Sequence, residues 1–259
     1  LDILRFLANE ESDQFSQELR FSYTTERLNL LLGAYYSKEE AMREDSLRYG
    51  ADDFLATLFA SLGLPGLDWT QDIEATSYAV FGQLEYSISD NTSFVLGLRQ
   101  SRDEKEGQLS GAGLAAFGLG DYLADIDDDW DSFDPMISFR SPLTDEVMTY
   151  VTWASGYKSG ALQYLAILPA AAQVSAAPEE SENVEIGLKG TFFDRTLRLN
   201  AAAFRTQIED LQALRVEPGS LIGVPVISNT GDATIEGFEV EGEYILSENI
   251  SVDFNYAYL

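Results

Sequence analysis

The sequence predicts an all-β chain that forms an antiparallel transmembrane β-barrel segment of about ten strands, partial and open. Three observations lead to this prediction: apolar and polar residues alternate, the alternating runs are mostly about nine to eleven residues long, and short and long connections alternate between them. A tilted strand that crosses a bilayer needs about nine to eleven residues, whereas strands of ordinary globular proteins peak near five or six. The run length therefore favours a sheet that crosses a membrane.

The strands are defined by a period of two. In the last run, 250–258, every second residue is apolar, namely Ile250, Val252, Phe254, Tyr256 and Tyr258. Only an extended chain places such a set on one face, because a helix distributes the same positions around its circumference. For the run 147–156, the sequence does not decide whether the odd-numbered or the even-numbered residues face outward. The other predicted strands are, in chain order, 15–23, 27–37, 78–88, 93–102, 132–140, 147–156, 184–192, 197–208 and 238–246.

The connections add an independent indication. Antiparallel strands joined by tight turns at one end and long loops at the other follow the plan of an outer-membrane barrel. A sandwich or a propeller gives no reason for such alternation. We predict one domain, 1–259, and a short helix at 52–62. The short connections are 24–26, 89–91, 141–146, 194–196 and 247–249, and the long ones are 38–75, 103–131, 157–181 and 209–226.

Composition excludes several function classes. The chain has 16 Lys and Arg against 44 Asp and Glu, a net charge of −28, which opposes a nucleic-acid partner. It has no His and no Cys, so imidazole metal sites, Ser–His dyads, thiolate nucleophiles and disulfides are excluded. We therefore predict no enzyme activity, no cofactor and no metal site. The 45% apolar content argues against disorder.

Polar positions of the predicted strands supply one candidate group. In a barrel they line a wet interior. Paired carboxylates for acid–base chemistry are the alternative, and the structural interpretation is the simpler one. The residues predicted to face the lumen are Glu85, Arg99, Arg140, Glu185, Lys189, Glu239 and Glu241.

Long loops supply the candidate ligand contacts. Aromatic and basic side chains at a loop mouth suit an anionic ligand, although such residues often serve only as interfacial or snorkelling groups. The ligand-binding candidates are Tyr157, Lys158, Tyr164 and Arg215.

An acidic stretch, 125–131, begins like a calcium loop. Trp130 stands where that loop requires Gly, and Met136 stands where it requires Glu. We therefore expect a solvated loop there, without a dedicated metal site.

Several runs occur in the order seen in one family. They are 16–21, 30–36, 78–83, 96–99, 182–190 and 229–242, together with Gly156-Tyr157-Lys158-Ser159-Gly160. With these runs the chain resembles the barrel of TonB-dependent outer-membrane receptors, especially the sphingomonad-type group.

The resemblance implies a 22-stranded barrel filled by an N-terminal plug, in the outer membrane of a Gram-negative bacterium. It also implies uptake energised by TonB with ExbB and ExbD, of a ferric siderophore or a similar large, scarce solute. The sequence shows no TonB box, plug or terminal aromatic strand, so we interpret it as incomplete at both ends.

The alternative interpretation is a soluble acidic all-β binding domain, such as a secreted sandwich. A sandwich buries its apolar face against a second sheet. A membrane barrel instead leaves that face exposed as a continuous band.

Overall fold

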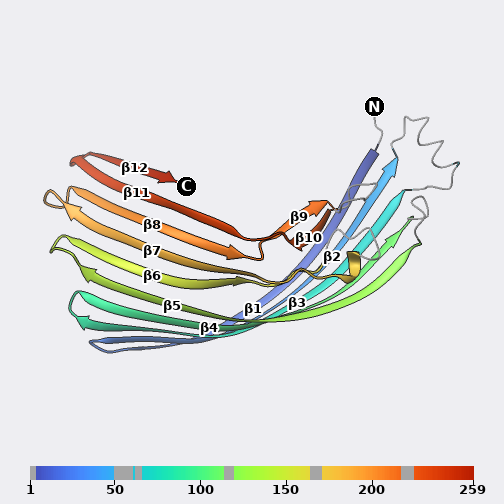
Figure 1. Ribbon diagram of the computed structural model, residues 1–259, viewed down its shortest axis with the longest axis horizontal. Helices are drawn as coiled ribbons and strands as arrows, with labels where there is room; N and C mark the ends of the chain where they lie inside the picture. Colours follow the sequence, from blue (N-terminus) through green and yellow to red (C-terminus); the bar gives the residue numbers. More distant parts are fainter. Residues whose placement is uncertain (1–3, 50–60, 62–65, 114–119, 164–170, 217–224) are drawn as a thin grey trace.

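A computed structural model of the chain describes residues 4–49, 61, 66–113, 120–163, 171–216 and 225–259. It is an antiparallel ten-stranded sheet in the order β1-β2-β3-β4-β5-β6-β7-β8-β11-β12. Strands β1 and β12 lie at the two edges, so the sheet is open, and Figure 1 shows it as a curved trough. All ten predicted strands lie in this sheet, which confirms the predicted fold class. The helix predicted at 52–62 falls, apart from Ser61, outside the described residues.

The strand bounds divide the sheet into long and short members. The long strands are β1 (Leu4–Thr24), β2 (Leu28–Tyr49), β3 (Leu67–Ser89), β4 (Thr92–Ala112) and β5 (Tyr122–Pro142). The shorter ones are β6 (Val147–Lys158), β7 (Glu179–Phe192), β8 (Leu197–Glu209), β11 (Ala233–Ser247) and β12 (Ile250–Tyr258). A separate hairpin pairs β9 (Gln212–Val216) with β10 (Pro225–Asn229), and one 3-10 turn, η2, spans Ala171–Gln173.

The predicted strand lengths are wrong for the first five strands, which have 21 to 23 residues. Four of these strands continue into stretches that we predicted as connections, namely 38–49, 67–75, 103–112 and 122–131. Polar residues occupy much of both parities there, as at Glu39 and Glu40, so the alternation of apolar and polar residues fades. The backbone ladder persists regardless, because it needs a neighbouring strand rather than apolar side chains. The short turns and long connections lie at opposite ends of the sheet, as predicted (Figure 1).

The register separates two faces. Seven apolar residues follow one another in a cross-strand row: Tyr23, Leu30, Leu84, Leu96, Ile137, Trp153 and Val184. We call the side that carries this row the apolar face. Its side chains include exposed ones such as Val80 (61%) and Ile186 (58%). Among the described residues, the only other sheet is the β9–β10 hairpin, which lies on the opposite side. The apolar face is therefore not buried as a sandwich requires.

The buried core lies on the opposite, polar face, near the long connections. Ala172 of η2 is fully buried against Leu109 and Ala124. Leu67 and Trp69 form a second buried pair beside it. Tyr122 packs against both groups.

Within the described residues, no helix is long and apolar enough to cross a bilayer.

The half-buried hydroxyl of Tyr122 makes the stability of this core depend on pH. Burial raises the pKa of its hydroxyl from 10.0 to about 12. The neutral phenol is therefore favoured in the folded state, so its stabilisation is full below pH 10 and is lost as the pH rises through about 12. We expect Tyr122→Phe to remove this part of the alkaline destabilisation. Unfolding free energies of wild type and variant from about pH 9 to about pH 12 test it, and parallel curves would contradict it.

Candidate ligand-binding site

Two segments fold inward over the polar face. The first, which we call the strap, comprises residues 159–163 and 171–178 of the connection from β6 to β7. Ala161 and Ala176 pair across it, with N–O distances of 3.1 and 2.8 Å. The second is the β9–β10 hairpin. Figure 1 shows η2 and this hairpin on the concave side of the sheet.

Amide side chains join the strap to the hairpin. Gln163, only 3% exposed, donates to the Ile227 carbonyl at 2.7 Å and accepts from the Ile227 N–H at 2.8 Å. Asn229 accepts from the Ala177 N–H at 2.9 Å and donates to the Ala177 carbonyl at 3.0 Å. Each amide thus reproduces a pair of backbone hydrogen bonds, so strap and hairpin form one cover.

The cover is fastened to the sheet from β4 and β5. Lys105 Nζ donates to the Gly160 carbonyl at 2.7 Å, and the Ser175 hydroxyl donates a hydrogen bond to the Asp128 carboxylate. A Cβ on Gly160 would lie 2.2 Å from a ring carbon of Trp130. Only glycine therefore lets the strap backbone approach the Trp130 ring this closely.

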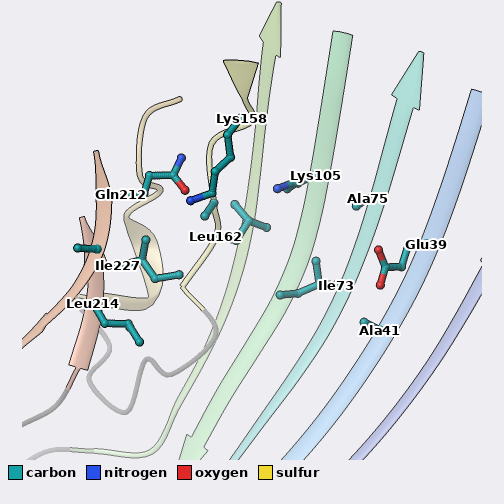
Figure 2. Close-up of a pocket in the computed structure, with 12 residues that line it drawn as sticks. Glu39, Ala41, Ile73, Ala75, Lys105, Lys158, Leu162, Gln212, Leu214 and Ile227 are labelled. Atoms are coloured by element: carbon teal, nitrogen blue, oxygen red, sulfur yellow. The ribbon is translucent and has the colours of Figure 1, made fainter. Parts of the chain in front are cut away.

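Between cover and sheet lies a cavity of about 600 Å³. Most of its lining is aliphatic, and its polar groups are two lysines, one carboxylate and one amide. In Figure 2, Glu39, Lys105 and Lys158 lie around this space. The lining residues are Glu39, Ala41, Ile73, Ala75, Lys105, Lys158, Ala161, Leu162, Gln212, Ala213, Leu214 and Ile227.

The two lysines differ in environment. Burial lowers the pKa of Lys105, against the opposing effects of Asp103 and Glu39. The ammonium of Lys105 also lies 5.7 Å from the Trp130 ring centroid, a cation–π contact. Lys158 is exposed and pairs with Glu179 at 3.3 Å. The cavity thus combines one desolvated ammonium with one solvated ammonium, and both can meet an anionic group.

Of the three predicted ligand-binding residues that the structure describes, only one lines the cavity. Lys158 does, at the last position of β6 rather than in a loop. Tyr157, also in β6 instead of a loop, does not line the cavity. Burial raises the pKa of its hydroxyl, and the nearby Asp103 carboxylate raises it further. Arg215 lies in β9, also not in a loop, and its neighbours Ala213 and Leu214 line the cavity. Tyr164 lies outside the described residues.

Sequence reasoning missed Lys105, Glu39 and Gln212. All three stood in stretches that we predicted as long connections. Apolar and polar residues do not alternate clearly there, so the sequence does not indicate which face of a sheet each side chain would occupy. Their convergence depends on strands that continue and on a strap that folds back.

The seven residues predicted to face the lumen all lie on the polar face by register, but they are spread from β3 to β11. Several are paired there. Arg140 contacts Glu85 at 3.3 Å. Glu185 accepts from the Tyr150 hydroxyl at 2.7 Å, and Glu241 accepts from the Asn200 amide at 2.6 Å. Arg99 lies 5.8 Å from each of the Tyr35 and Phe81 ring centroids, Lys189 lies 5.7 Å from that of Tyr150, and Glu239 is opposite Ala202. These contacts fit a wetted structural face and do not gather into one site.

The acidic stretch is not the loop that we predicted. It lies within β5, so Asp125, Asp127, Asp129 and Asp131 alternate with Asp128, which faces the strap. Arg102 neutralises part of the row, contacting Asp129 at 3.1 Å and Asp131 at 3.3 Å. In the described part of the chain, no three acidic groups are arranged to hold a metal ion.

An open, curved antiparallel sheet with one exposed apolar face and an inward-folded cover is the architecture of an outer-membrane barrel wall. The sequence model of the TonB-dependent receptor-like β-barrel matches residues 4–259. The chain therefore belongs to this family, as the resemblance in its sequence indicated.

Its curated relatives include proteins that are named as receptors. The chain is 29% identical over 194 residues to a probable TonB-dependent siderophore receptor, PiuA, of Acinetobacter baumannii, covering 73% of this chain and 24% of that protein. It is 29% identical over 195 residues to the pesticin receptor of Yersinia enterocolitica, covering 74% of this chain and 27% of that protein. The chain thus spans about a quarter of the length of these curated relatives. They are named as receptors rather than enzymes. They do not confirm the narrower sphingomonad-type prediction.

Solved structures share the fold. The ferric yersiniabactin uptake receptor FyuA from Yersinia pestis superposes with a TM-score of 0.78 at 22% identity, over 97% of this chain and 35% of that one. The copper transporter OprC superposes with a TM-score of 0.66 at 17% identity, over 97% of this chain and 39% of that one. At these identities the likeness supports the architecture alone.

Proposed function

We propose that this chain forms part of the barrel wall of a receptor that takes up a ferric siderophore, or a similar large and scarce solute, across the outer membrane of a Gram-negative bacterium. One observation carries the proposal. A single ten-stranded sheet has an exposed apolar face on one side, and on the other a polar face whose cover overlies an open cavity of about 600 Å³. This is the division between lipid and lumen that a transport barrel needs.

The proposed orientation follows from the connections. Short turns face the periplasm and long connections face the outside in such barrels. The strap, the hairpin and the cavity then lie on the extracellular side, where a ligand arrives. Energy would come from TonB, ExbB and ExbD through a plug domain. The seven polar-face residues, Glu85 and Lys189 among them, would line the lumen. The net charge of −28 argues against nucleic acid as a ligand.

The cavity suggests the chemistry of the ligand. Aliphatic side chains such as Ile73, Leu162 and Leu214 suit an apolar body. Lys105 and Lys158 suit an anionic oxygen, such as a carboxylate or phenolate. Tyr157 and Arg215 stay proposed contacts in the surroundings of this cavity. Tyr164, which lies outside the described residues, stays a proposed ligand contact without a structural placement. A ferric siderophore that carries an apolar scaffold and acidic groups meets both requirements.

Uptake by the whole receptor tests the function. Cells that lack their own receptors and express it would be given radioactive iron as ferric yersiniabactin, with copper ions as a second substrate. We expect iron accumulation that disappears in cells without TonB. Copper accumulation would favour a metal-ion transporter instead, and accumulation independent of TonB would contradict the proposal.

Lys158→Met tests the cavity. A hydrogen bond to a charged group contributes about 1.5–3 kcal/mol, and solvent exposure of Lys158 places its effect at the low end, roughly a tenfold weaker affinity. Ferric yersiniabactin binding to the purified receptor measures this change. Lys189→Met is the matched control, since Lys189 shares the polar face but lies near the short turns. Equal losses in both variants would argue against the cavity as the binding site.

A further inference from the structure

Among the residues that the structure describes, three buried polar groups on the polar face lack hydrogen-bond partners. They are Asp45 Oδ1, Trp69 Nε1 and Gln71 Nε2. The residues are 2%, 6% and 3% exposed, respectively. An unmade hydrogen bond in such surroundings is unfavourable, so native structures rarely leave three together.

The register brings the three side chains together. Asp45 of β2 lies directly opposite Trp69 of β3, and Gln71 follows two residues later on the same face. Opposite residues on one face have Cβ atoms about 4.5–5.5 Å apart, and diagonal neighbours about 7–8 Å. Gln71 is opposite Arg43, whose Nε donates to Asp45 Oδ2 at 2.8 Å. Arg43 thus holds the Asp45 carboxylate in place and leaves the other oxygen free.

The three groups are chemically complementary to one small molecule. Asp45 Oδ1 accepts a hydrogen bond, whereas Trp69 Nε1–H and Gln71 Nε2–H donate. A water molecule can donate to the first and accept from the other two, which makes the three bonds typical of buried water. A metal cation is unsuited to the place, because the guanidinium of Arg43 and two further N–H donors surround the one carboxylate.

The side chains around Asp45, Trp69 and Gln71 limit the size of the molecule that can lie between them. Leu47 and Tyr122 pack against Leu67 and Trp69, and the Phe6 ring lies 6.0 Å from that of Trp69. None of the three residues lines the 600 Å³ cavity. We propose that a single internal water bridges Asp45, Trp69 and Gln71, and that it fastens β2 to β3 beside the region covered by η2.

A high-resolution crystal structure of the whole receptor tests the site. We expect one density peak within about 3 Å of Asp45 Oδ1, Trp69 Nε1 and Gln71 Nε2. Direct hydrogen bonds among the three side chains, or absence of the peak, would overturn the proposal.

Gln71→Met gives a second test, because the direction of the change in hydrogen-exchange protection distinguishes a bridging water from an unpaired amide. If the water is present, the substitution removes one of its bonds, and hydrogen-exchange protection of the β2–β3 backbone amides around Asp45 falls about tenfold. If the Gln71 amide is unpaired, removing it leaves protection unchanged or raises it, which would overturn the proposal. Gln83→Met is the matched control, because Gln83 lies on the same face of β3 but is exposed. We expect no change in that variant.

Discussion

Leu84→Arg is expected to destabilise the receptor in a bilayer by roughly 2–4 kcal/mol, the depth-dependent cost of arginine on the lipid face near the midplane. Leu84 lies on the apolar face between Leu30 and Leu96, five positions before Ser89 ends the strand. The guanidinium would have to enter hydrocarbon or pull water toward it, and both are unfavourable. Urea unfolding of the whole receptor in phospholipid vesicles measures the loss.

Gln83→Arg is the control for that substitution. Gln83 is the preceding residue of the same strand and projects from the polar face at nearly the same depth. We expect its cost to be well below that of Leu84→Arg. A larger cost for Gln83→Arg than for Leu84→Arg would contradict the assignment of the two faces.

Gln163→Leu is expected to release the strap from the hairpin. The substitution leaves the N–H and carbonyl of half-buried Ile227 without the two hydrogen bonds that Gln163 now makes. An unmet buried group costs about 1–3 kcal/mol, and these two are only half-buried, so the cover would lose roughly 1–3 kcal/mol of local stability in total. Limited proteolysis of the whole receptor should then cut within the strap far faster than in the wild type.

Gln173→Leu serves as the comparison, because Gln173 lies in the same strap but is exposed. We expect its proteolysis to match the wild type. Equal cleavage of wild type and Gln163→Leu would show that the amide does not hold the cover in place.

The strands were predictable wherever one parity is apolar. In β12 the alternation from Ile250 to Tyr258 located the strand almost to the residue, since lipid or core contact imposes that pattern directly. The extension of β2 beyond Ser37 was not predictable in this way. There Glu39, Glu40 and Glu44 occupy both parities, and the backbone ladders to β1 and β3 hold the strand.

The site was less predictable than the fold, because its contacts join distant parts of the chain. Lys105 binds a carbonyl 55 residues away, and Gln163 binds a backbone unit 64 residues away. No local pattern reports such pairs. Gly160 belonged to a run that resembled the family, but the reason for a glycine, its approach to Trp130, appears only in three dimensions.

Nitroxide labels along β12 test the central claim most directly, that one parity contacts lipid and the other does not. This chain has no cysteine, so single cysteines from Ile250 to Tyr258 introduce no competing label within it. In the whole receptor in vesicles, we predict high collision rates with oxygen at Val252, Phe254 and Tyr256, and low rates at Asp253 and Asn255. Oxygen accessibility without this period of two, or with its maxima at Asp253 and Asn255, would contradict the account.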